Sequence, residues 1–97
     1  MPKLRWLPSA LDDLDRLANF IAVQHPNAAK TAVKRIRNAA DQLEVFPEVG
    51  RRMKRDDDRR ELVVPFASGA YVLRYRFDRG NDAVVVIRVW HSRELRY

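Results

Sequence analysis

Two predicted strands carry side chains that could bind an anion. Arg74 and Arg76 alternate with apolar residues in one strand, and Arg88 and Trp90 do so in the next. Alternate residues of a strand point to the same side of a sheet. Guanidinium groups bind phosphates or carboxylates through paired hydrogen bonds, and an indole ring offers a stacking surface. We therefore expect these four residues to bind a target. The alternative is a solvated face on which an arginine stacks on Trp90.

The pairing of these two strands decides which residues share that face. If a five-residue loop pairs Phe77 with Ala83, then Tyr75 meets Val85 and Leu73 meets Ile87. This apolar side would pack on the helices, with Arg74, Arg76, Arg88 and Trp90 together on the opposite side. The sequence accordingly predicts a shared core formed by these residues: Ile21, Ile36, Leu43, Leu73, Tyr75, Val85 and Ile87.

The charge of the chain points to an anionic partner. The 97 residues carry 19 Lys+Arg and 13 Asp+Glu, a net charge of +6. Residues 51–97 hold twelve of the basic and seven of the acidic groups, so most of the excess lies in the second half. We expect a polyanionic or acidic partner there, although a basic surface without such a partner remains the alternative.

Composition also excludes several kinds of site. The chain has no cysteine, which rules out disulfides, thiolate nucleophiles and cysteine-bound zinc. With only two histidines, neither a metal nor another cofactor is expected. The longest apolar run, Ala83 to Ile87, is too short to cross a membrane, and no signal peptide is visible, so we expect a cytoplasmic protein.

A polar loop is predicted at 49–60. Its basic residues Arg51, Arg52, Lys54 and Arg55 could contact an acidic target or partner, or could simply be solvated. Asp56, Asp57 and Asp58 could in principle hold a cation, but three consecutive carboxylates without a ligating fold are expected to be solvated.

The elements that position these residues are a strand, two helices and three strands. Lys3 to Leu7 reads as a strand, and Ser9 with Asp12 reads as a capping box that opens a helix ending near Gln24. A second helix is predicted from about Asn27 to Phe46, with an apolar stripe and a short turn that forces an antiparallel hairpin. That stripe consists of Ala29, Val33, Ile36, Ala40 and Leu43.

Three strands are then predicted, at Glu61 to Phe66, Tyr71 to Phe77 and Ala83 to about His91. A helical hairpin packed on a largely antiparallel sheet is an α+β fold with the order βααβββ. We expect a single domain over residues 1–97.

The ordered set of motifs resembles the RelE/ParE superfamily of bacterial toxins from type II toxin–antitoxin modules. The resemblance covers nearly the whole chain, and no single piece of it is specific. It rests on Pro-Ser-Ala-Leu-Asp-Asp-Leu at 8–14, the Leu…Pro…Gly-Arg landmark at 43–51, Tyr-Val-Leu-Arg-Tyr-Arg at 71–76 and Val-Trp-His-Ser-Arg at 89–93.

The resemblance implies a growth-inhibiting toxin that a cognate antitoxin neutralises. Family antitoxins are often acidic, which fits a chain of charge +6. An amphipathic antitoxin helix could lie along the helical hairpin, and operator DNA would be contacted through the antitoxin. The residues expected to bind the antitoxin are Leu17, Ile21, Ala29, Val33 and Ile36.

The superfamily divides into two mechanisms. RelE-like members cleave mRNA in the ribosome, whereas ParE-like members poison DNA gyrase. The ribonuclease relatives carry an arginine directly after the tyrosine that opens the middle strand, where this chain has Val72. His91, Arg93 and Tyr97 could stand in for the catalytic groups of that branch, but their spacing does not match cleanly.

The ending at 89–93 is closer to the ParE-like members, so inhibition of gyrase is expected, with Arg74, Arg76, Arg88, Trp90 and Arg93 as target-binding residues. A ribosome-dependent endoribonuclease and a simple basic nucleic-acid-binding module are the alternatives.

Overall fold

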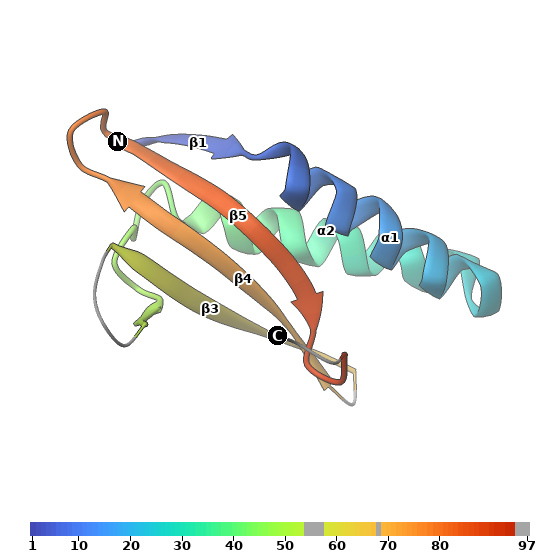
Figure 1. Ribbon diagram of the computed structural model, residues 1–97. Coiled ribbons are helices and arrows are strands. Elements are labelled where there is room, and N and C mark those ends of the chain that lie inside the picture. The colour runs from blue at the N-terminus through green and yellow to red at the C-terminus, as the bar shows by residue number, and fades with distance from the viewer. Residues whose placement is uncertain (54–57, 68, 95–97) are drawn as a thin grey trace.

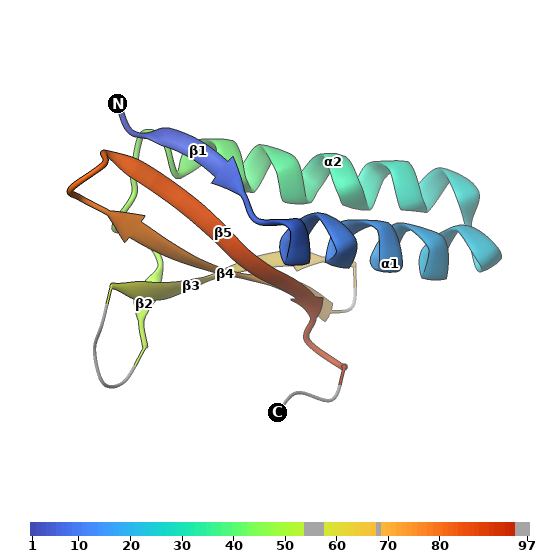
Figure 2. The same cartoon turned by 45° about the horizontal axis from the view of Figure 1, so that its top comes forward.

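One face of a five-stranded sheet is covered by two antiparallel helices. The structure is a computed structural model that describes residues 1–53, 58–67 and 69–94. The elements are β1 (Lys3–Trp6), α1 (Pro8–Gln24), α2 (Pro26–Gln42), β2 (Arg51–Arg52), β3 (Arg59–Phe66), β4 (Gly69–Asp78) and β5 (Ala83–His91). The strand order is β1-β5-β4-β3-β2 (Figures 1 and 2). β1 runs parallel to β5, and the other pairs are antiparallel. The predicted α+β fold is confirmed.

The loop before β3 contains a short edge strand that the sequence did not predict. Arg51 pairs with Glu61 and Arg52 with Arg60, so β2 forms the outer edge of the sheet. Residues 54–57, which include Lys54, Arg55, Asp56 and Asp57, lie outside the described residues. None of the described helices is long and apolar enough to span a membrane.

The first helix does not begin with the predicted capping box. Leu7 is the N-cap, no side chain caps the helix, and Pro8 opens it, which suits a residue that lacks an amide hydrogen. Ser9 therefore lies inside the first turn. Its hydroxyl donates to the carbonyl of Ile87 in β5 at 2.8 Å, so it ties the helix to the sheet.

The second helix is shorter than predicted because its end turns into the core. α2 stops at Gln42, and the amides of Leu43, Glu44 and Val45 bond to carbonyls three residues back. Such tighter turns commonly end helices. Leu43 is fully buried against Tyr75 and Val84, which explains the turn.

The predicted pairing of β4 with β5 is wrong by one residue near the turn. Asp78 pairs with Ala83, and Tyr75 pairs with Val86 rather than Val85. The Asp78 carboxylate accepts hydrogen bonds from the amide and side chain of Asn81, which closes a four-residue turn, 79–82. A slip of one residue exchanges the two faces of a strand, so Val84 and Val86 face the helices.

A β-bulge between Arg74 and Tyr75 then corrects the alternation. On the side of the bulge away from the 79–82 turn, Leu73 pairs with Val89 and Arg74 with Arg88. Ile87 is therefore the extra, unpaired residue of β5. Of the predicted core, Ile36, Leu43, Leu73 and Tyr75 are fully buried, Ile21 packs against the core, and Ile87 is only half-buried. Val85 is buried but belongs to neither core cluster.

Side chains of α1 complete the edge of β5 where β1 ends. β1 pairs with β5 only over 83–86. Beyond that point the Asp13 carboxylate accepts a hydrogen bond from the amide of Val89 at 2.8 Å, and Arg16 donates to the Val89 carbonyl at 3.2 Å. An exposed strand edge invites pairing with other chains, and here polar groups of a helix satisfy it.

The Asp13 carboxyl is buried, with 4% of the residue exposed. Burial alone would raise its pKa, but hydrogen bonds from Arg88, the Val89 amide and Arg16 together hold the pKa below its ordinary value. Both Asp13 oxygens bind Arg88, at 2.8 and 3.1 Å. Asp13 is thus the ionised group that fixes α1 to β5.

A tyrosine at the other end of the sheet fixes the segment between α2 and β2. The Tyr75 hydroxyl accepts a hydrogen bond from the Gly50 amide at 2.8 Å and donates to the Pro47 carbonyl at 2.9 Å. A Cβ on Gly50 would lie 2.6 Å from that hydroxyl oxygen and 3.0 Å from the Glu61 carbonyl oxygen. Only glycine fits at this position.

Replacing Asp13 by Asn should destabilise the fold by about 1–3 kcal/mol at neutral pH, because the Arg88 ion pair is lost. A pKa that is lower in the folded state than in the unfolded state contributes stability above the unfolded pKa and loses it as the pH falls. The difference between wild type and Asp13→Asn in urea denaturation should therefore shrink below about pH 4. Asp12→Asn, an exposed change on the same helix, is the control. A difference that is the same at pH 6 and pH 3 would contradict this role.

Two substitutions test the Tyr75 contact. Tyr75→Phe leaves the buried Gly50 amide without its acceptor, and Gly50→Ala forces a Cβ against the ring, so each should cost about 1–3 kcal/mol. Gly80→Ala is the control, since the nearest atom to its added Cβ is 3.6 Å away and its φ is not positive. Chemical denaturation of the three variants measures the effect. Equal stability of Gly50→Ala and Gly80→Ala would disprove the contact.

Candidate functional site

The face of the sheet opposite the helices brings Arg74 and Trp90 together as predicted. The guanidinium carbon of Arg74 lies 5.0 Å from the centre of the Trp90 ring. Arg74 also donates to one oxygen of Glu61 through Nε at 3.1 Å and Nη2 at 2.8 Å. Val72 is paired with Trp90 in the ladder. On this face the guanidinium of Arg74 therefore stacks on the Trp90 ring and is hydrogen-bonded to the Glu61 carboxylate.

The other two predicted arginines of that face are not equivalent to Arg74. Arg76 pairs with Val85 and lies 3.8 Å from the Asp78 carboxylate, with 42% of its side chain exposed. Arg88 turns instead to α1 and binds Asp13, which raises the Arg88 pKa through the hydrogen bond. Arg88 is paired with Arg74 in the ladder, so it leaves β5 on the predicted face, but its guanidinium turns to the buried carboxylate of Asp13, a partner that the sequence did not predict.

His91 lies on the helix side of the sheet. It pairs with the buried Tyr71, and the two rings meet edge to face with centroids 5.2 Å apart. The His91 Nδ1 accepts a hydrogen bond from the Arg93 amide at 3.1 Å, and the His91 amide donates to Glu94 at 2.7 Å. Glu94 also binds Arg16 of α1. Tyr97, the third residue of the predicted catalytic set, lies outside the described residues.

A cavity of about 690 Å³ lies between this end of the sheet and α1. His91, Arg93 and Glu94 line it from the strand end, and apolar residues of α1 line it from the helix. Burial raises the pKa of the Tyr71 hydroxyl, which also faces this cavity. Within the described residues, then, His91 shares its surroundings with Tyr71 and Arg93, and not with Arg74.

The helical hairpin presents different apolar residues from those predicted to bind an antitoxin. Leu17, Ala29 and Ile36 are buried in the isolated chain, while Ile21 and Val33 are partly exposed. Leu11 of α1 is 43% exposed, and the two most exposed large apolar side chains of this helix are Phe20, 71% exposed, and Val23, 85% exposed. In this helix the spacing of Leu14, Leu17 and Ile21 marks the face that packs inward, and Phe20 and Val23 lie off that face, which is the signal in the sequence that they have no partner within the fold.

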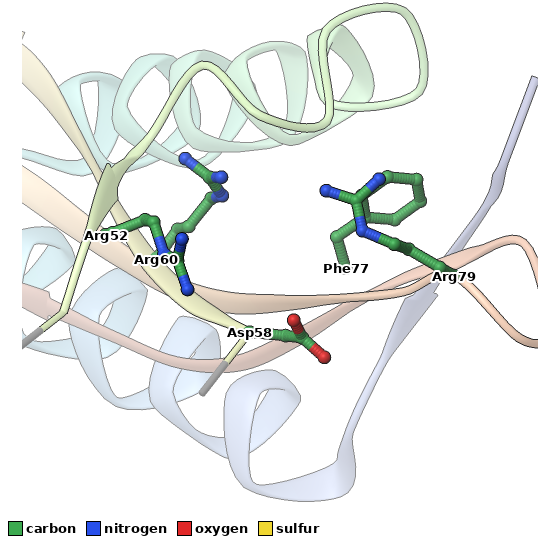
Figure 3. A pocket seen from close by; sticks show the side chains of 5 residues that line it. All are labelled: Arg52, Asp58, Arg60, Phe77 and Arg79. Carbon is green, nitrogen blue, oxygen red and sulfur yellow. The ribbon is translucent and has the colours of Figure 1, made fainter. Parts of the chain in front are cut away.

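A second cavity lies at the opposite end of the sheet and is strongly basic. It measures about 270 Å³ and is lined by Arg52, Asp58, Arg60, Phe77 and Arg79 (Figure 3). Sequence reasoning named Arg52 and missed Arg60 and Arg79. The doublets Arg51-Arg52 and Arg59-Arg60 were visible, but their pairing across β2 and β3 was not.

No metal site is found in the parts of the chain that the structure describes, since no three His, Asp or Glu side chains there are grouped suitably. Of the aspartate run at 56–58, only Asp58 is described, and it lies at the basic cavity.

Comparison with known proteins agrees with this fold. A family model described as the ParE toxin of the type II toxin–antitoxin system parDE matches residues 4–96. Toxin RelE3 of Caulobacter vibrioides is 39% identical over 89 residues, which cover 92% of each chain. Toxin RelE1 of the same organism is 34% identical over 84 residues, covering 87% of this chain and 86% of the relative.

Two solved structures share the fold at low sequence identity. The chromosomal ParDE system of P. aeruginosa superposes with a TM-score of 0.77 at 22% identity, over 94% of this chain and 96% of that one. The intact RelBE toxin–antitoxin complex of E. coli superposes with a TM-score of 0.71 at 16% identity, over 97% and 100%. With nearly its whole length matched by the family model and by these relatives, the chain belongs to the ParE toxin family and is a type II toxin of the RelE/ParE superfamily.

Proposed function

We propose that this toxin inhibits its target by binding it, that the target is DNA gyrase, and that it does not cut RNA. The observation that carries the proposal is the separation of its candidate groups. Arg74 and Trp90 lie on the open face of the sheet, whereas His91 packs against Tyr71 on the helix side. The ParE description of the matching family supports the same branch.

The chemistry of metal-free RNA cleavage explains why this separation matters. A base must take the proton of the 2′-hydroxyl, an acid must protonate the leaving oxygen, and cations must stabilise the phosphorane, all around one phosphate. Arginine supplies charge but does not act as a base, because its guanidinium does not give up its proton in a protein. On the described open face the nearest carboxylate to Arg74 is that of Glu61, and Arg74 itself occupies one of its oxygens.

The same groups are suited to binding. The Trp90 ring stacks on the guanidinium of Arg74 and orients it. Arg76, in the same strand, adds a second positive charge that is about half exposed. Together, Arg74 and Arg76 can bind a carboxylate or a phosphate of a macromolecular partner. Arg88 contributes indirectly, since its bond to Asp13 holds β5 in position. This proposal places the toxin in the cytoplasm, where gyrase works.

A cognate antitoxin is the second proposed partner. The structural neighbours are a ParDE system and RelBE toxin–antitoxin complexes. In this chain, Phe20 lines the cavity of about 690 Å³ together with two basic residues, Arg16 and Arg93, and one acidic residue, Glu94, and Val23 is exposed on the same helix. An acidic amphipathic helix of the antitoxin would cover the apolar side chains and meet the two basic side chains. Operator DNA would be bound through the antitoxin.

A ribosome-dependent endoribonuclease is the alternative. It is favoured by the RelE names of the relatives from C. vibrioides and by the cavity that holds His91, Arg93 and Tyr71 together. Imidazoles are common general acids and bases, so His91 could move a proton there.

A two-part assay separates the two mechanisms. Purified toxin is added to gyrase supercoiling reactions and, separately, to translating ribosomes with a defined mRNA. We expect loss of supercoiling with accumulated gyrase–DNA cleavage complexes and intact mRNA. Arg74→Gln should weaken inhibition of gyrase about tenfold, because a charged hydrogen-bonding group is removed from the interface.

Two further variants make the assay specific. Arg37→Gln is the matched control, since Arg37 also stacks on a tryptophan, Trp6 at 6.0 Å, but lies on α2. It should leave inhibition unchanged, as should His91→Ala. Cleaved mRNA that disappears with His91→Ala, while supercoiling continues, would overturn the gyrase proposal in favour of the endoribonuclease.

The antitoxin surface has its own test. Phe20→Asp should weaken binding of the cognate antitoxin by about a hundredfold in calorimetry, because it puts a carboxylate against an apolar and acidic partner. The fold should persist, since Phe20 is 71% exposed. Val45→Asp, at a residue 53% exposed after α2, is the control. Equal losses with the two variants would show that the antitoxin does not bind along α1.

A further inference from the structure

The small basic cavity is built by three arginines from separate parts of the chain. Arg52 and Arg60 face each other across β2 and β3 in direct register. Arg79 follows β4, and its guanidinium lies 4.8 Å above the ring of Phe77. Figure 3 shows Arg52 and Arg60 on one side of the hollow, Arg79 over Phe77 on the other, and Asp58 at its rim. The cavity lies at the end of the sheet away from His91, and none of its residues belongs to the two sites described above.

The positive charge of this cavity is only partly neutralised. Arg60 donates to the backbone carbonyls of Glu48 at 3.0 Å and Gly50 at 2.9 Å, which orient it without cancelling its charge. Apart from the backbone pairing of β2 with β3, the Arg52 side chain makes no hydrogen bond to a residue that the structure describes, and its charge acts on Glu48. Arg79 forms an ion pair with the Glu48 carboxylate, and both side chains are half or more exposed. An ion pair in water is weak and easily exchanged.

Glu48 marks the point where the three charges converge. The hydrogen bond from Arg79 lowers its pKa most, and the fields of Arg60 and Arg52 lower it further. Three guanidinium groups thus act on one carboxylate that lies beside the cavity, and Asp58 is the carboxylate that lines the cavity itself. A phosphate offers more acceptor oxygens than one carboxylate and matches the fork of each guanidinium, so it is the better ligand for such a place.

We propose that this cavity is a phosphate-binding site in which a phosphate replaces Glu48 as the partner of Arg79. A volume of about 270 Å³ admits a phosphate together with its first linkage. Phe77 supports Arg79 from below and keeps its plane fixed when Glu48 moves away. The phosphate is that of a nucleic-acid strand or of a free nucleotide, since both present the same group. The site is independent of whether gyrase or the ribosome is the target.

The test is a titration of the folded full-length chain followed by amide NMR shifts. The probes are inorganic phosphate, ATP and a ten-nucleotide single strand, at constant ionic strength. We expect saturable shifts at Gly50, Arg52 and Arg79. Binding of inorganic phosphate and ATP alike indicates a free nucleotide, whereas much tighter binding of the strand indicates nucleic acid.

Three variants decide between this site and general attraction to a basic protein. Arg52→Gln should lower affinity about tenfold, as expected for one lost charged hydrogen bond. Arg51→Gln is the matched control, because it removes the same charge from the next residue of β2, which points to the other face. Glu48→Gln should raise affinity several-fold, since the competing carboxylate is gone.

Several outcomes would overturn the proposal. They are the absence of saturable shifts with all three probes, equal losses with Arg51→Gln and Arg52→Gln, and an unchanged or lower affinity of Glu48→Gln with spectra that show an intact fold. An acidic peptide that binds in an Arg52-dependent way and is not displaced by phosphate would also overturn it, because the cavity would then bind carboxylates of a protein.

Discussion

One buried carboxylate holds the helical layer in register with the sheet. The Asp13 carboxylate on α1 accepts hydrogen bonds from the amide of Val89 and from the guanidinium of Arg88, both in β5. An ionised group so deeply buried is tolerable only when its lone pairs are satisfied, and here Arg16 adds a further donor. The same helix closes the strand edge that β1 leaves open, so the position of α1 and the end of the sheet are set together.

This arrangement explains why the two candidate sites are separate. α1 draws Arg88 toward itself and forms one wall of the cavity that contains His91. The opposite face keeps Arg74 on Trp90, with Glu61 as its counter-ion. A β-sheet one residue thick separates an imidazole from the arginines, and groups on opposite faces cannot act on the same phosphate.

The far end of the sheet depends on a different buried group. The Tyr75 hydroxyl of β4 forms hydrogen bonds with the Pro47 carbonyl and the Gly50 amide. These two bonds fix the position of the segment between α2 and β2 relative to β4. Arg60 reinforces the same segment through two backbone carbonyls. The basic cavity is therefore a consequence of the packing of this segment and does not need a loop to close around it.

The sequence by itself determined the order of the elements other than β2, the helical hairpin and most of the core. Hydrophobic period, proline positions and turn residues are local signals, and they were enough to predict the α+β fold and the burial of Ile36, Leu43, Leu73 and Tyr75. Composition and the motif order were enough for the toxin superfamily. The open face with Arg74 and Trp90 also followed from alternation alone, because beyond the bulge the predicted and observed faces coincide.

Only the tertiary structure decided the partners of the polar side chains. The one-residue slip at the 79–82 turn moved Val84 and Val86 inward, and the bulge at Ile87 restored the predicted alternation beyond it. Neither can be read from a run of five apolar residues. Asp13 finds Arg88 seventy-five residues away, Ser9 bonds a strand instead of capping its helix, and Arg52 meets Arg60 across an unpredicted strand. The first two pairs join residues more than seventy positions apart, and the third depends on the pairing of β2 with β3, so all three rest on distances that only the folded chain sets.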